Sequence, residues 1–254
     1  MSTMLTLEYL FAFIFGTIVG SFANVCIHRL PWRQSLAAPG SHCPFCQQPI
    51  RPWHNIPLLS YLWLGGRCAD CHVTISWRYP LVELLCGLLY VFLYHHFGLS
   101  VESVIFILLA TTLLIVSFID LAHTIVPDAI TLPGMLVGLF ASLALTSIGI
   151  VDAILGLCLG GGLFLLIALL SRGGMGGGDI KLIAMIGAFL GWQAVLVTIL
   201  FGALLGALVG LGLIVLKKKG RRDPVPFGPF LALGALIAMV WGHDLFQWYL
   251  HHTP

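Results

Sequence analysis

The chain has 254 residues, of which 59% are hydrophobic and only 9% are charged, and its mean hydropathy is +1.02. A soluble domain carries about 25% charged residues to cover its surface, so this composition excludes an ordinary soluble protein. It also excludes a disordered chain, a collagen-like fibre and a small disulfide scaffold. The sequence therefore predicts an all-α polytopic membrane protein.

Apolar runs of about 20 residues are long enough to cross the hydrocarbon layer as helices. We expect about eight transmembrane helices, near 8–28, 81–97, 102–119, 129–147, 150–170, 181–199, 200–216 and 227–250. The first run is kept as a span because no basic residue precedes Arg29 and no small-residue cleavage site follows the run, as a signal peptide would require. Only the weak turn Gly191-Trp192-Gln193 separates the sixth span from the seventh.

The basic residues predict how the chain is oriented in the membrane. All twelve Lys and Arg residues fall in connections that follow the first, fifth and seventh spans. Near the span ends on the opposite side there are acidic residues and no Lys or Arg. Cytoplasmic loops carry an excess of positive charge. We therefore expect these connections in the cytoplasm and both termini on the non-cytoplasmic side.

One sizeable polar segment, residues 29–80, is rich in Pro, Arg and His, and no internal repeat is apparent in the chain. Glycine is frequent in the second half, notably Gly160-Gly161-Gly162 and from Gly202 to Gly212. Small residues let membrane helices approach closely, so we interpret most of these glycines as packing positions. The expected parts are a first helix (1–28), a cytoplasmic loop (29–80) and a seven-helix membrane domain (81–254).

Four of the seven cysteines form two C-x-x-C pairs, Cys43 with Cys46 and Cys68 with Cys71, separated by 21 residues. Paired knuckles of this kind are typical of a tetrahedral four-thiolate zinc site. Two disulfides are the competing interpretation, and the reducing cytoplasm predicted for this loop favours the metal. Four thiolates leave zinc no open position, so its expected role is structural.

The remaining cysteines and the neighbouring histidines are interpreted as non-ligands. His42 and His72 adjoin the knuckles but exceed the four ligands that zinc needs. Cys26, Cys86 and Cys158 are solitary cysteines in apolar helices, where a free cysteine behaves as a small hydrophobic residue.

Two aspartates stand where aspartates are costly. Asp120 ends the third span, and Asp179 follows a glycine-rich segment and begins the sixth span. Ionisable residues near a membrane span indicate function by default. The predicted topology brings both to the cytoplasmic ends of their helices. Two converging carboxylates suit an aspartic protease, in which one takes a proton from water while the other, protonated, polarises the scissile carbonyl.

The residues around these aspartates receive separate interpretations. Gly176, Gly177 and Gly178 are expected to line the substrate site, because backbone without a Cβ can approach a peptide closely and adopt positive φ. Asp128 follows a proline and precedes an apolar run, so we interpret it as a helix N-cap and not as a catalyst. Lys181 either marks the membrane interface or pairs with a carboxylate.

These segments together resemble the bacterial type IV prepilin peptidases (prepilin leader peptidase/N-methyltransferases), which belong to the GxGD membrane aspartic proteases. The resemblance runs through nearly the whole chain, with one visible departure at Ala23, where a Leu is usual. The matching segments are 20–25 with 29–31, 41–46, 55–60, 78–83, 118–128 and 176–182.

The resemblance implies that Asp120 and Asp179 are the catalytic pair and that the four cysteines form a cytoplasmic zinc-binding element. It implies prepilin or type II secretion pseudopilin substrates, cleaved after the leader Gly at the cytoplasmic face of the bacterial inner membrane. Many members then methylate the new N-terminal amine with S-adenosylmethionine. We therefore expect that methyl donor as a second cofactor, residues 29–80 as the methyltransferase part, and no nucleic-acid partner.

Two alternatives from other classes are a proton-coupled membrane transporter that uses the same aspartates and a non-enzymatic, zinc-stapled assembly scaffold. Transporter folds often contain internal repeats and helices broken near the midplane. The expected position of both aspartates at helix ends favours the protease instead, and a scaffold leaves the paired aspartates unexplained.

Overall fold

The computed structural model describes residues 2–145, 147–171, 174–216 and 225–252. Within these ranges the chain is helical and forms no strand, which confirms the all-α prediction. The basic residues Arg172, Lys217, Lys218, Lys219, Arg221 and Arg222, and Gly173 of the glycine-rich segment, lie outside the described residues. The described helices are α1 (Ser2–Arg29), η1 (Leu30–Trp32), η2 (Pro52–Asn55), α2 (Leu59–Trp63), α3 (Arg78–Phe97), α4 (Val101–His123), α5 (Asp128–Ala141), α6 (Ile150–Leu170), α7 (Gly177–Val215) and α8 (Gly228–His252).

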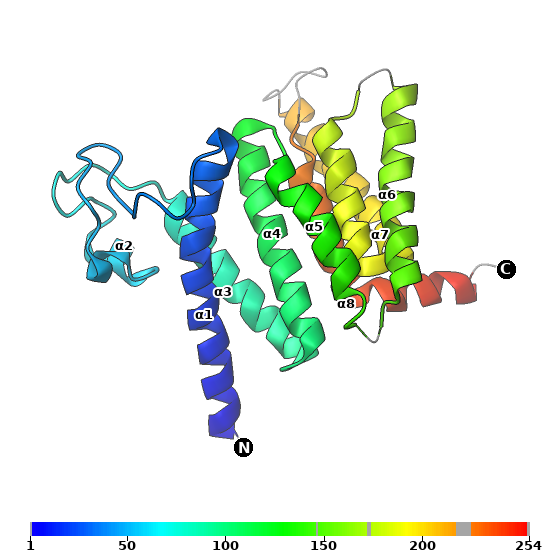
Figure 1. The fold of residues 1–254 in the computed structure, drawn as a ribbon, viewed down its shortest axis with the longest axis horizontal. Helices are drawn as coiled ribbons and strands as arrows, with labels where there is room; N and C mark the ends of the chain where they lie inside the picture. The colour runs from blue at the N-terminus through cyan, green and yellow to red at the C-terminus, as the bar shows by residue number, and fades with distance from the viewer. Residues whose placement is uncertain (1, 146, 172–173, 217–224, 253–254) are drawn as a thin grey trace. The chain divides into compact units, whose positions relative to one another are not determined.

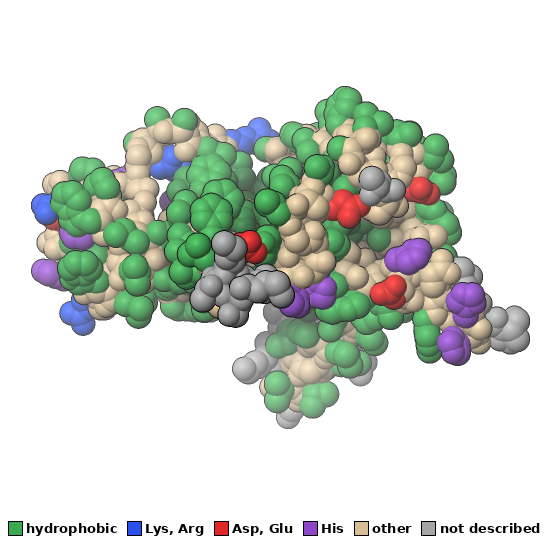
Figure 2. Space-filling model, turned by 90° about the horizontal axis from the view of Figure 1, so that it is seen from below, with side chains coloured by type: hydrophobic (Ala, Val, Ile, Leu, Met, Phe, Trp, Pro, Cys, Tyr) green, Lys and Arg blue, Asp and Glu red, His purple; other side chains and the backbone are tan. Residues whose placement is uncertain are grey.

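Six of the described helices, α1, α3, α4, α6, α7 and α8, are long and apolar enough to cross a membrane. Large apolar side chains remain exposed on their surfaces, and hydrophobic side chains cover much of the face shown in Figure 2. A helix satisfies its own backbone hydrogen bonds, which a segment in hydrocarbon must do. The chain is therefore a multi-pass membrane protein.

The expected number of about eight spans is not confirmed by helix length and composition. Helix α5 has only 14 residues. Helix α7 has 39 residues and is interrupted at Gly191, whose φ of 78° and ψ of 175° are not helical. The break lies at Gly191, within the turn that the sequence indicated between the sixth and seventh spans, and not at residues 199 and 200, where the approximate span limits meet. Hydropathy stays high on both sides of Gly191, so it gives the wrong boundary.

The chain divides into two compact units, Met1–Ile107 and Leu108–Pro254. In the first unit α1 packs along α3 (Figure 1). A Cβ at Gly20 of α1 would lie 2.7 Å from the Cα atom of Glu83, so the two helices meet almost backbone to backbone. This packing keeps α3 with the first unit, whereas the sequence placed a boundary after residue 80. The assignment of methyl transfer to residues 29–80 and of peptide cleavage to residues 81–254 stays a prediction.

In the second unit α5, α6 and α8 all pack against α7 (Figure 1). The part of α7 before its break contacts α6, where a Cβ at either Gly156 or Gly187 would strike the other's backbone. The part after the break contacts α8, where a Cβ at Gly234 would strike the carbonyl oxygen of Thr198. Small residues thus set the spacing of this bundle.

The interpretation of glycines as packing positions holds for some and fails for others. Gly160 and Gly161 face residues of α7, and Gly202 and Gly206 face residues at the start of α8. A Cβ added at the other three glycines of these runs would meet nothing within 4 Å; they are Gly162, Gly210 and Gly212. Sequence alone does not say which face of a glycine-rich helix is turned to a neighbour.

This difference predicts opposite effects for two glycine substitutions. Gly187→Ala forces a methyl group into the backbone of α6 and is expected to destabilise the protein by about 1–3 kcal/mol through overpacking. Gly162→Ala adds its methyl group to open space and is expected to be neutral or to stabilise by up to about 1 kcal/mol through helix propensity. Thermal unfolding of the two detergent-purified variants measures the difference; equal melting temperatures would contradict this packing.

Candidate active site and metal centre

A cavity of about 250 Å³ lies in the second unit, where the end of α4, the α4–α5 connection and the start of α7 meet. Its lining residues are Asp120, Thr124, Ile125, Val126, Asp128, Gly176, Gly177, Gly178 and Asp179. The structure therefore brings together both aspartates and all three glycines that the sequence singled out. Their catalytic roles remain predictions.

Asp120 lies in the last turn of α4 and is only 5% exposed. Its carboxylate oxygen Oδ2 accepts a hydrogen bond of 2.8 Å from the backbone N–H of Gly228, the first residue of α8. A Cβ at Gly228 would lie 2.8 Å from the same oxygen, which is closer than real contacts allow. Glycine at this position therefore lets the start of α8 reach the carboxylate.

Asp179 is the third residue of α7, and its side chain is half-buried at the cavity. Its backbone N–H donates to the carbonyl oxygen of Gly176 over 3.1 Å as the helix begins. The charge of Asp120 acts on its carboxyl group, so the two acidic side chains are near enough to repel each other. Such a pair holds one proton between them more readily than two negative charges.

The glycines before Asp179 serve close approach and not unusual backbone angles. A Cβ at Gly178 would lie 2.8 Å from the Cβ of Val126, so the α4–α5 connection can approach α7 only because residue 178 has no side chain. A Cβ at Gly177 would meet nothing within 4 Å. Among the described glycines of this segment none has a positive φ. The expected use of positive φ is therefore wrong here.

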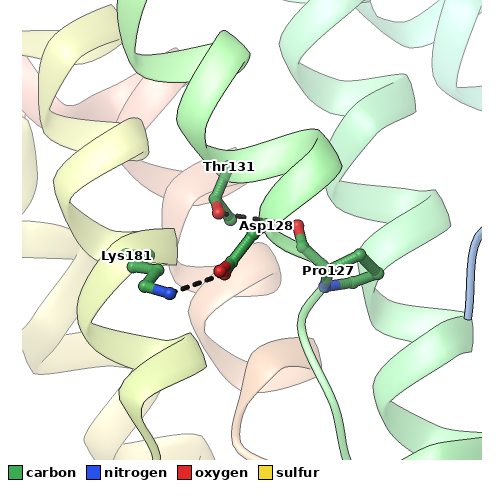
Figure 3. A network of polar contacts seen from close by, with 4 residues as sticks. All are labelled: Pro127, Asp128, Thr131 and Lys181. Atoms are coloured by element: carbon green, nitrogen blue, oxygen red, sulfur yellow. Dashed lines mark hydrogen bonds and ion pairs between the residues drawn. The ribbon is translucent and has the colours of Figure 1, made fainter.

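The sequence suggested that Asp128 caps α5, but in the structure it does not. Pro127 occupies the N-cap position and Asp128 is the first helical residue. The Asp128 carboxylate instead accepts a hydrogen bond of 2.6 Å from the Lys181 ammonium group (Figure 3). This ion pair decides between the two interpretations of Lys181. Both side chains are substantially exposed, at 57% for Asp128 and 38% for Lys181, so the pair contributes little stability.

In the first unit the four predicted cysteines converge. Their Sγ atoms all lie within 4.8 Å of one another, and those of Cys43 and Cys71 are 3.8 Å apart. Zinc–sulfur bonds of about 2.3 Å in a tetrahedron separate the sulfur atoms by about 3.8 Å. None of the four forms a disulfide. This cluster is a candidate metal site, and among the described residues it contains no histidine.

The two cysteine knuckles are built alike, although no repeat is apparent in the sequence. In each, the backbone N–H of the first cysteine is hydrogen-bonded to a carbonyl five residues on, from Cys43 to Gln48 and from Cys68 to Val73. In each, the residue after the second cysteine has positive φ, at 58° for Gln47 and 57° for His72. The repeat shares few residue types beyond its cysteines, so backbone geometry reveals it and sequence similarity does not.

One thiol is prepared for metal binding by its own knuckle. A hydrogen bond from the backbone N–H of Cys46 lowers the pKa of Cys43 to about 7, against an opposing effect of burial. Thiolates are the form that binds metal, and backbone N–H donors stabilise them. The knuckle thus favours the charged form of the Cys43 thiol, the form that a metal site requires.

Two charged residues with no role predicted from sequence tie the polar loop to the helices. The Arg29 guanidinium, buried at the end of α1, donates to the carbonyl oxygens of Ser35 over 2.9 Å and Pro39 over 2.6 Å. The Glu83 carboxylate, buried on α3, accepts from the backbone N–H of Leu58 over 2.8 Å. The one feature of the sequence that could have indicated a role for Arg29 and Glu83 is that each is a charged residue at the edge of an apolar run.

Two family models match the chain. The bacterial peptidase A24 N-terminal domain matches residues 14–97, and the type IV leader peptidase family matches residues 107–211. The chain belongs to the type IV leader peptidase family. The two matches of this family meet near the boundary between the compact units, at residues 107 and 108.

Three curated relatives from this family carry the name prepilin leader peptidase/N-methyltransferase. The Aeromonas hydrophila protein is 40% identical, with 96% of this chain and 94% of the relative covered. The Stutzerimonas stutzeri protein is 41% identical, with 94% and 92% covered. The Pseudomonas aeruginosa protein is 40% identical, with 93% and 91% covered. No solved structure matches the chain.

Proposed function

We propose that this protein is a prepilin leader peptidase and N-methyltransferase, which removes the basic leader from type IV prepilins or type II secretion pseudopilins and methylates the new N-terminus. The observation that carries the proposal is the cavity lined by both Asp120 and Asp179, in a chain whose relatives bear that name over nearly their full length. A transporter has no support among these relatives.

The two aspartates perform the cleavage. The ionised carboxylate takes a proton from a water molecule, which attacks the carbonyl carbon of the leader Gly, while the protonated carboxyl group donates to the carbonyl oxygen. The glycine segment 176–178 leaves one side of the cavity without side chains, which suits an extended peptide.

The topology expected from the basic residues requires that α7 cross the membrane twice, and contacts within the second unit support this. The start of α8 reaches Asp120, so it lies at the same end as the start of α7. The second part of α7 runs antiparallel to α8, because Thr198 contacts Gly234 while Gly206 contacts Phe227. The chain therefore returns after Gly191. The six long helices, the second crossing of α7 and the short apolar helix α5 as a further crossing together make eight. Both termini are then non-cytoplasmic and the cavity opens on the cytoplasmic side.

Cys43, Cys46, Cys68 and Cys71 would hold one Zn²⁺, and the separation of their sulfur atoms fits tetrahedral coordination. Four thiolates fill the coordination sphere, so the ion would supply cross-linking of the loop and no activated water. The two knuckles, together with Arg29 and Glu83, then hold the loop to the ends of α1 and α3.

We assign methyl transfer to residues 29–80 with the adjoining ends of α1 and α3. Bound S-adenosylmethionine would supply the methyl group. The loop offers a second cavity of about 270 Å³, lined by Pro39, Gly40, Ser41, His42, Gln47 and Pro49. The lining offers the polar side chains of Ser41, His42 and Gln47 and contains no Lys or Arg, which suits a nucleoside better than an anion.

The separation of the two sites predicts that the activities can be uncoupled. Asp120→Asn protein is expected to methylate an already cleaved pilin peptide at a rate near that of the wild type, because the substitution lies outside the first compact unit. Detergent-purified protein is incubated with intact or cleaved peptide, with and without S-adenosylmethionine, and the products are weighed by mass spectrometry. Loss of methylation in this variant would contradict separate sites.

A further inference from the structure

The segment Phe227–Phe230 supplies a backbone donor to Asp120, a contact that the sequence did not indicate. The Gly228 N–H donates to Oδ2 of Asp120 over 2.8 Å, across 108 positions of the chain. The first N–H groups of a helix have no partner within the helix, so this donor is free for the carboxylate. The inference drawn from it rests on the proposed function, in which Asp120 and Asp179 form the catalytic pair.

We propose that the Gly228 N–H makes Asp120 the ionised member of the pair, the general base that activates water, and leaves the shared proton on Asp179. A backbone donor aimed at a carboxylate oxygen stabilises its charged form, because the hydrogen bond is stronger to the anion than to the neutral acid. Gly228 is therefore a positioning residue for the reaction.

The two carboxyl groups differ in this hydrogen bond. Asp179 lies in the first turn of its own α7, and Asp120 accepts from the first residue of α8, so the favourable N-terminal end of a helix dipole acts on each. Asp120 also lies in the last turn of α4, whose C-terminal dipole opposes its charge, so the charge of Asp120 depends on the donor from α8. Within the described residues, Asp120 alone of the two accepts a hydrogen bond at its carboxylate. The direct donor therefore decides which group keeps its charge.

Two other titratable groups lie near the two aspartates, Asp128 and His123. Asp128 lines the cavity, but its charge is paired with Lys181. His123 lies in the last turn of α4 beside Asp120. Residues 225–231, which bring the donor from α8, contain no titratable side chain. Asp179 is thus the group with which Asp120 competes for the proton.

The donor is held in place by packing around it. The Phe227 ring lies 6.2 Å from that of Phe164 on α6 and also contacts Gly206 on α7. Leu231 of α8 is fully buried and packs against Gly202. These contacts fix the first turn of α8, so the N–H needs no rearrangement to serve the reaction, as preorganised donors require.

The assignment specifies the path of each proton. Water attacks the carbonyl carbon and forms the C–O bond; its proton passes to Asp120, while the Asp179 proton passes to the carbonyl oxygen and gives a gem-diol. The C–N bond then breaks: the leaving amine receives the proton from Asp120, and one gem-diol hydroxyl returns its proton to Asp179. The products are a free carboxylic acid and an amine, and both aspartates regain their starting states.

The test compares Gly228→Ala with Gly228→Pro. Both add a Cβ at the position 2.8 Å from the Asp120 oxygen, but only proline removes the N–H, and proline is tolerated at the first position of a helix. Cleavage of a prepilin peptide is measured as kcat/KM against pH for both. Relative to the alanine variant, we expect the acidic limb for the proline variant to move to higher pH by about one to two units, since a base deprived of its donor ionises later.

A second variant removes the donor without adding a side chain. Incorporation of glycolic acid at position 228 replaces the amide by an ester, and it is expected to move the acidic limb in the same direction relative to the wild type. Profiles of the proline and alanine variants that superimpose, or an ester that shifts only the basic limb, would overturn the assignment.

These outcomes are separate from a failure of the catalytic pair. If Asp120→Asn and Asp179→Asn both abolish cleavage while the profiles at position 228 do not change, the pair stands and the role of Gly228 fails. If either Asn variant cleaves at the rate of the wild type, the catalytic pair itself is wrong, and with it the assignment of its general base.

Discussion

Asp120→Asn and Asp179→Asn are each expected to lower leader cleavage by about 10³-fold or more, the range that general acid–base groups contribute. Asparagine keeps the shape of the side chain but cannot exchange a proton, and the mechanism needs both groups to do so. The Asp120→Asn amide also loses the charge that Gly228 stabilises. Cleavage of a prepilin peptide by each variant, at equal abundance in membranes, measures the effect.

Asp128→Asn is the graded control for this experiment. Asp128 lines the same cavity, but its carboxylate is exposed and pairs with Lys181, so its loss removes only a weak surface ion pair. We expect its rate to stay within about tenfold of the wild type.

The wild-type rate should fall on both sides of an optimal pH, because one carboxyl group must be ionised and the other protonated. Near-normal release of the leader by either dyad variant would refute the proposed chemistry.

Removal of one zinc ligand is expected to have the second-largest effect. The purified protein should hold about one zinc ion, and Cys43→Ser or Cys71→Ser should lose it, because a closed four-thiolate site needs all four donors. Structural zinc contributes about 10–16 kcal/mol to the folding of small zinc domains. Without it the loop should unfold, as limited proteolysis within residues 29–80 would reveal, whereas the Asp120 cavity belongs to the other compact unit.

Cys158→Ser is the matched control, since it removes a cysteine from α6 that belongs to no ligand cluster among the described residues. It should retain full zinc content and the proteolysis pattern of the wild type. Elemental analysis that finds no metal, together with two disulfides in protein prepared under reducing conditions, would instead support the disulfide alternative.

Much of the candidate site could be predicted because it is encoded in contiguous residues. The C-x-x-C spacing identifies the four cysteines as candidate metal ligands, and the structure places all four sulfur atoms together. Asp120 and Asp179 are conspicuous because a carboxylate at the end of an apolar run is costly. Each of these features is visible within a short window of sequence.

Other features depend on which helix faces meet. The sequence indicated the turn at Gly191, but the limits 181–199 and 200–216 missed it because hydropathy is similar on both sides of the break. The interpretation of Asp128 as a cap failed because its partner, Lys181, is supplied by another helix 53 positions away. The local sequence around Asp128 cannot show whether its carboxylate caps α5 or pairs with a lysine, because the packing of the helices determines where that lysine lies.

The sequence by itself determined that this protein is a membrane protein, that its four paired cysteines form one cluster and that two aspartates stand at span ends. Composition and short residue spacings carry that information. Only the tertiary structure decided that both aspartates line one cavity and that Gly228 donates to just one of them. That asymmetry arises because glycine contacts set the approach of α8 to α7, and a hydrogen bond of 2.8 Å exists only when two distant segments are packed to that distance.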